Sequence, residues 1–101
     1  MTKKEFDEIT DAEFLKFENI PENERLNIYP DLCALIYLAR LSQSQLLHLE
    51  PKRTCDMIVG AEHDIMFIGF PGENLTTADA IYIARCGVHW SSECDCLALF
   101  T

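Results

Sequence analysis

The chain has 101 residues, of which 49% are hydrophobic and 25% are charged. This length suits one domain rather than two cores, and the hydrophobic content excludes intrinsic disorder, which combines low hydrophobicity with high net charge. Seventeen acids against eight bases give a formal net charge of −9, a sign that disfavours direct contact with nucleic-acid phosphates or anionic lipid.

The first two elements are predicted from capping signals. Thr2 with Glu5, and Thr10 with Glu13, each have the spacing of a capping box, in which a hydroxyl and a carboxylate satisfy the free amides of a helix start. We therefore expect one helix to begin after Thr2 and a second after Thr10. Phe14 and Phe17 would form a short apolar stripe on the second helix. Pro21 would end it.

The third element is a helix that begins at Pro30, because proline suits a first helical turn. The run 32–41 is apolar at nearly every position, which predicts a buried central helix rather than a half-exposed one. We expect this helix to close over 42–45.

The second half of the chain predicts short strands around one further helix. A polar segment of hairpin length, 60–64, separates two β-type runs. Thr76 and Asp79 form another capping box with Leu75 as a staple, and Gly87 suits the left-handed end of the helix that follows. A terminal hairpin completes the chain. The expected strands are 46–49, 57–59, 65–68, 88–90 and 94–100.

Together these elements predict an α+β fold in a single domain over residues 1–101. N-terminal helices and a buried central helix would pack on a small, mostly antiparallel sheet. One five-residue segment occurs twice: Ile-Tyr-Leu-Ala-Arg at 36–40 returns as Ile-Tyr-Ile-Ala-Arg at 81–85. The residues around the two copies do not align, so we interpret the match as a coincidence of two amphipathic helices.

The start of the chain and its cysteines favour a reducing, cytoplasmic compartment. No apolar run of the signal-peptide type follows Met1, and no segment approaches the roughly 18 consecutive apolar residues that a membrane span requires. The five cysteines are an odd number, which favours reduced thiols over a disulfide framework. We expect a cytoplasmic protein with no membrane partner.

Acidic residues are concentrated late in the chain. From Thr54 to Thr101 there are seven acids and one base, Arg85, which is a net charge of −6. Such a surface attracts basic protein surfaces, although net negative charge also simply keeps a small domain soluble. The turns and helix starts of this half would display carboxylates, with Trp90 as an aromatic anchor. The predicted partner-binding residues are Glu62, Asp64, Glu73, Asp79, Trp90, Glu93 and Asp95.

A metal site is the alternative prediction for the same region. Cys86, His89, Cys94 and Cys96 have the spacing C-x2-H-x4-C-x-C, and zinc takes four sulfur or nitrogen ligands. The simpler explanation is strand alternation, since Cys94, Cys96, Ala98 and Phe100 would share one face of a strand as core residues. We therefore expect no cofactor, with zinc on these four residues as the alternative.

No catalytic motif is present, so we expect a non-enzymatic protein. Candidates for a nucleophilic site (Cys55, His48, His63 and Asp64) have no flanking signature that joins them. The basic residues are scattered, which disfavours direct nucleic-acid binding.

The predicted function is to occupy a basic surface of a partner protein. The partner would be a nucleic-acid-handling enzyme, inhibited in the anti-restriction, anti-CRISPR or DNA-mimic manner, or a toxin bound by its immunity protein. Another hypothesis is a structural subunit whose apolar central helix completes a homodimer.

Overall fold

The computed structural model describes residues 1–45, 58–62, 64–69, 75–92 and 96–100, with the backbone alone for 42–45, 58–59 and 61–62. The helices are α1 (Lys3–Glu13), α2 (Pro30–Gln45) and α3 (Thr77–Arg85), with single 3-10 turns at Phe17–Asn19 and Glu22–Glu24. The strands are β1 (Ile58–Glu62), β2 (Ile65–Ile68), β3 (Val88–Ser91) and β4 (Cys96–Phe100). The strand expected at 46–49 lies outside the described residues.

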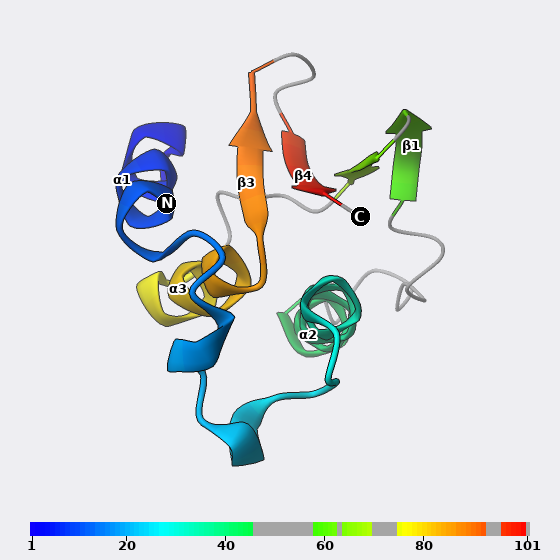
Figure 1. The fold of residues 1–101 in the computed structure, drawn as a ribbon. Helices are drawn as coiled ribbons and strands as arrows, with labels where there is room; N and C mark the ends of the chain where they lie inside the picture. The colour runs from blue at the N-terminus through cyan, green and yellow to red at the C-terminus, as the bar shows by residue number, and fades with distance from the viewer. Residues whose placement is uncertain (46–57, 63, 70–74, 93–95, 101) are drawn as a thin grey trace.

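The described strands form one antiparallel sheet in the order β1-β2-β4-β3. The β1–β2 and β3–β4 pairs confirm both predicted hairpins, but β1 continues through Glu62, so the first turn is shorter than the predicted 60–64. Because β2 and β3 each run antiparallel to β4 between them, they are parallel to one another, and α3 lies in the connection that joins them. The helices gather on one side of the sheet (Figure 1), so the fold is α+β, as predicted.

The first helix begins as predicted but continues past the second expected start. Thr2 and Glu5 form both bonds of the capping box. Thr10 lies inside α1, where its hydroxyl donates to the Phe6 carbonyl oxygen at 2.9 Å instead of capping a new helix. The predicted second helix is therefore wrong. The chain turns at Leu15, whose φ is +59°, and continues as two isolated 3-10 turns.

The second helix, α2, begins at Pro30 and ends at Gln45, which confirms the prediction. The expectation that the run 32–41 is buried nearly all round is corrected, because α2 rests against α3 and the core on one face while Leu32 (42% exposed) and Arg40 face solvent. Five of its residues are buried: Cys33, Ala34, Leu35, Leu38 and Ala39.

The third helix is fixed by the signals expected at both of its ends. The Thr76 hydroxyl accepts from the Asp79 amide at 3.2 Å, and the Asp79 carboxylate accepts from the Thr76 amide at 3.1 Å. Leu75 is buried beside this cap. After α3, Gly87 adopts φ +99°, a conformation that L side chains rarely take.

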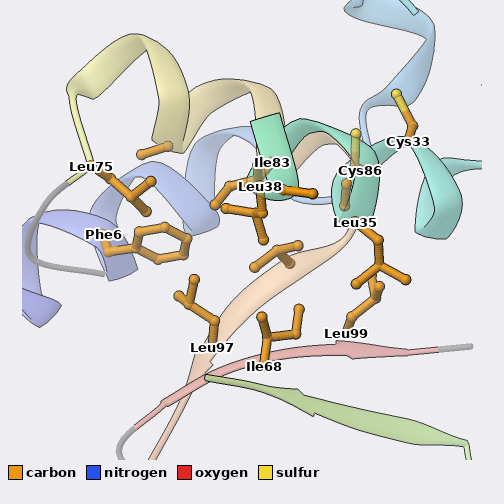
Figure 2. Packing of buried hydrophobic residues seen from close by; sticks show 14 of the residues in the cluster. Phe6, Cys33, Leu35, Leu38, Ile68, Leu75, Ile83, Cys86, Leu97 and Leu99 are labelled. Carbon is orange, nitrogen blue, oxygen red and sulfur yellow. The ribbon is translucent and has the colours of Figure 1, made fainter. Parts of the chain in front are cut away.

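The core lies between the helices and the sheet (Figure 2), and Leu97 and Leu99 of β4 belong to it. Their cross-strand partners on β3 are Trp90 and Val88, so all four side chains share the face of the sheet that meets the helices. Cys96, Ala98 and Phe100 share one face of the strand, as predicted, but it is the face opposite to the helices. Ala98 is fully buried there and Phe100 is 47% exposed, so the prediction that this face is the main core face is wrong. Within the described ranges, no helix has the length and apolar character needed to cross a membrane.

Candidate functional site

The predicted acidic face is only partly within the described residues. Glu62 ends β1 with its side chain outside the described atoms, and Asp64 is exposed in the turn that follows. Glu73, Glu93 and Asp95 lie outside the described residues, as do Cys55, His48 and His63 of the catalytic hypothesis.

Asp79 is not a surface contact. Its side chain is buried, with the residue 7% exposed, and it accepts a hydrogen bond from the Tyr37 hydroxyl at 2.7 Å in addition to capping α3. Both carboxylate oxygens are thus used inside the protein. The prediction that Asp79 binds a partner is corrected: the residue stabilises the start of α3 and orients Tyr37.

Trp90 is partly buried and packs against the core. It is half-buried on β3, and its ring meets Phe6 edge-on with 6.0 Å between the ring centroids. Edge-to-face aromatic pairs of this kind stabilise a core beyond the area they bury. Trp90 therefore holds α1 against the sheet, a role that alternation along β3 could have indicated.

Among the described side chains, most of the exposed carboxylates belong to the N-terminal part of the chain. Of the described side chains, seven carboxylates are exposed against three cations, which are Lys4, Lys16 and Arg40. Two further acids are neutralised locally: Asp7 by Lys3 at 2.8 Å, and Glu13 by Arg85 at 2.9 Å. The exposed carboxylates are Glu5, Glu8, Asp11, Glu18, Glu22, Glu24 and Asp64.

A groove of about 330 Å³ runs between α1 and α3. Its lining combines apolar side chains with three carboxylates from successive turns of α1, Glu5, Glu8 and Glu13. Hydrogen bonds from the Thr2 backbone and side chain lower the pKa of Glu5, so this carboxylate stays ionised at neutral pH. The apolar lining residues are Met1, Ile9, Ala12 and Ile81.

The four residues of the zinc alternative do not come together in the described part of the chain. Cys86 is buried in the core, whereas His89 stacks on Phe100 at 4.9 Å on the opposite face of the sheet. Cys96 is disulfide-bonded, which corrects the expectation of reduced thiols at this position, and so it has no free thiolate for a metal. Cys94 lies outside the described residues. Among the described histidines, cysteines and acids, no group of three or more could hold a metal ion.

Of the described cysteines, Cys33 and Cys86 are buried free thiols. Burial raises the pKa of Cys86, and the neighbouring Cys33 raises it further. A thiol in this state is a poor nucleophile and a poor metal ligand. The pair therefore behaves as core packing, since a buried free thiol acts as a small hydrophobic group.

A second hollow is a cleft of about 810 Å³ between α2, α3 and the segment that joins α1 to α2. Tyr37 of α2 and Tyr82 of α3 stack at its base with 4.1 Å between centroids and 15° between ring planes. Arg40 and Arg85 also line it, one from each helix. The remaining lining residues are Ile20, Pro21, Glu24, Leu26, Leu41, Ala78 and Ile81.

Hydrogen bonds fix both tyrosines of the stack. The Tyr37 hydroxyl donates to Asp79, and the Tyr82 hydroxyl donates to the Glu24 carbonyl oxygen at 2.7 Å. Since a phenol has one proton, the Cys33 thiol is the donor in its 3.0 Å contact with the Tyr82 oxygen. Burial raises the pKa of both phenols, and the hydrogen bond to Asp79 raises that of Tyr37 further, so both remain protonated at neutral pH.

The repeated five-residue segment is the sequence signal for this cleft, although we interpreted it as a coincidence. Both stacked tyrosines and both arginines come from its two copies. No family model matches the chain, and neither a curated protein nor a solved structure matches it.

Proposed function

We propose that this protein is a non-enzymatic binding protein that occupies a basic surface of a partner protein. The observation that carries the proposal is the groove between α1 and α3, whose apolar lining is bordered by the exposed carboxylates of Glu5 and Glu8. Lysine and arginine side chains combine an aliphatic stem with a charged end. A groove of this composition therefore suits a basic side chain that projects from a partner.

The charge of the whole molecule supports the same role. The net charge of −9 would attract a basic surface over a distance of about 10 Å at moderate salt and so speed association. The partner we propose is a nucleic-acid-handling enzyme, whose basic surface the carboxylates occupy in place of phosphates, or a nuclease toxin neutralised by an immunity protein. A cytoplasmic location would suit either role.

The test measures binding to a panel of purified DNA-cleaving enzymes and nuclease toxins between 50 and 500 mM salt, with inhibition of DNA cleavage read in parallel. We expect tight binding and inhibition of at least one enzyme at low salt, with affinity falling steeply as salt rises. Affinity that does not change with salt, or no binding to any enzyme of the panel at low salt, would contradict the proposal.

Two charge reversals in the same helix locate the contact. Glu8→Lys acts within the groove, and Asp11→Lys makes the same change in net charge at an exposed position of α1 that does not line it. We expect Glu8→Lys to weaken binding about tenfold or more, because it removes an attraction and adds a repulsion at the contact. Equal weakening by the two variants would show that the groove is not the contact.

A further inference from the structure

The two copies of the repeated segment lie against each other in the folded protein. Ile36–Arg40 belongs to α2 and Ile81–Arg85 to α3, and the second residues of the two copies are the stacked tyrosines, Tyr37 and Tyr82. In each copy the arginine follows the tyrosine by three positions. Positions i and i+3 share one face of a helix, so each helix presents a tyrosine and an arginine to the same cleft.

The third wall of the cleft is the segment 20–26, which internal bonds hold in place. Arg25 donates from Nε to the Ile20 carbonyl oxygen at 2.9 Å, and its guanidinium lies 5.0 Å from the centre of the Phe17 ring. The bond from Tyr82 to Glu24 ties this wall to α3. A cleft whose walls are already fixed loses little conformational entropy when a ligand enters it.

The lining of the cleft differs in charge from the rest of the molecule. Two guanidinium groups and one carboxylate, that of Glu24, line an otherwise apolar hollow in a chain of net charge −9. Arg85 is anchored by Glu13 and by the Asn19 carbonyl oxygen, whereas Arg40 is exposed at the edge of the cleft. An anionic group is therefore favoured at Arg40, and a guanidinium matches the two oxygens of a carboxylate.

We propose that this cleft binds a small amphipathic carboxylic acid. Its carboxylate pairs with Arg40, and its apolar body lies against the tyrosine pair and the side chains of Leu26, Leu41 and Ile81. The volume of about 810 Å³ is within the range of about 300–1,000 Å³ that is usual for small-molecule sites. This site adjoins the acidic groove between α1 and α3, because Ile81 lines both.

Titration calorimetry on the full chain tests the proposal with two carboxylate probes, 2-naphthoate and decanoate below its micelle concentration. The control ligand is 2-naphthamide, which keeps the aromatic body and removes the charge. We expect at least one carboxylate to bind with one site per chain, and the amide to bind at least about tenfold more weakly than naphthoate where naphthoate binds. Naphthoate binding alone indicates an aromatic acid, and decanoate binding alone an alkyl acid. Binding of neither overturns the proposal.

Two variants and one control assign the binding to this cleft. Arg40→Gln removes the charge at an exposed position, and Ala78→Phe fills the cleft from an exposed position of α3. We expect each to weaken carboxylate binding at least about tenfold, with circular dichroism spectra and melting temperatures close to wild type. Lys4→Gln, an exposed cation of α1 outside the lining, should bind as wild type. Wild-type affinity in both cleft variants, or an amide that binds as tightly as naphthoate, overturns the proposal.

Discussion

Leu15 lies directly against Gly87, so that a β-carbon at Gly87 would be 2.8 Å from Leu15 Cδ2. The Leu15 amide also donates to the Ala84 carbonyl oxygen at 3.0 Å, which joins the end of α1 to the end of α3. Gly87 therefore serves two purposes: it adopts φ +99° to end α3, and it leaves room for Leu15.

Gly87→Ala is expected to lower the free energy of unfolding by about 1–2 kcal/mol, the usual cost of a side chain in the left-handed region. Urea denaturation measures this loss. In the double variant Gly87→Ala with Leu15→Ala, the close atom of Leu15 is removed. This variant should recover the part of the stability loss that comes from the contact, and it should keep the part that comes from the positive φ at position 87. An alanine variant as stable as wild type would contradict the assigned conformation.

Asp79→Asn is expected to destabilise the protein by about 1–3 kcal/mol. The two oxygens of the Asp79 carboxylate accept from the Thr76 amide and the Tyr37 hydroxyl, and an asparagine would turn an NH2 group toward one of these donors. Thermal melts of Asp79→Asn and of Asp64→Asn, its exposed counterpart, give the comparison. Asp64→Asn should change stability by less than about 0.5 kcal/mol. Equal effects would argue against the buried role of Asp79.

His89 is expected to make stability depend on pH near neutrality. Its imidazole stacks on Phe100 and meets Phe14 edge-on, and burial lowers its pKa below the usual value. The unfolded chain then binds a proton more readily than the folded one, so the free energy of unfolding falls as pH drops through about 6.5. Above that pH the imidazole is neutral in both states, and this contribution is constant.

Urea melts between pH 7.5 and 5.5 measure the slope of the free energy of unfolding against pH, in wild type and in His89→Phe. The variant keeps the aromatic packing and the other two histidines, His48 and His63, and it should lose the part of the slope that belongs to His89. An identical slope in both proteins would assign the pH dependence to other groups.

Capping residues and glycine predicted the ends of a helix correctly where the same residues had no other place in the structure. The capping box at Thr76 and Asp79 and the glycine at 87 gave both ends of α3. The box at Thr10 and Glu13 failed because the same residues also fit the interior of a helix that had already begun at Thr2. Capping spacing identifies a possible start, but only the preceding chain decides whether that start is used.

The sequence alone could not show which face of β4 meets the helices, for a physical reason. Residues 96–100 are apolar on both faces, so alternation could not choose between Leu97 with Leu99 and Cys96 with Ala98 and Phe100. The choice depends on the register with β3 and on the helices that cover one face. The cleft could not be predicted for a similar reason. The repeated segment is visible in the sequence, but the stacking of Tyr37 on Tyr82 depends on how α2 and α3 pack together.

The packing of Phe6 against Trp90 provides a direct measure of how strongly α1 is held to the sheet. Phe6 is fully buried and meets Trp90 edge-on at 71° between ring planes. Replacing a buried phenylalanine by alanine costs about 3–5 kcal/mol, which could unfold a small domain whose total stability is about 5–15 kcal/mol. Phe6→Leu is therefore the informative change, because it removes the ring and keeps an apolar side chain.

We expect Phe6→Leu to lower the free energy of unfolding by about 1–2 kcal/mol. Trp90 is the only tryptophan of the chain, so its fluorescence follows urea unfolding without an added label. The matched control is Leu15→Ala, which shortens a side chain that is 54% exposed and should cost less than Phe6→Leu. If the midpoint of Phe6→Leu does not move, α1 is not anchored through this aromatic pair. Loss of the native Trp90 signal at low urea in Phe6→Leu would instead show that the sheet edge depends on α1 for its packing.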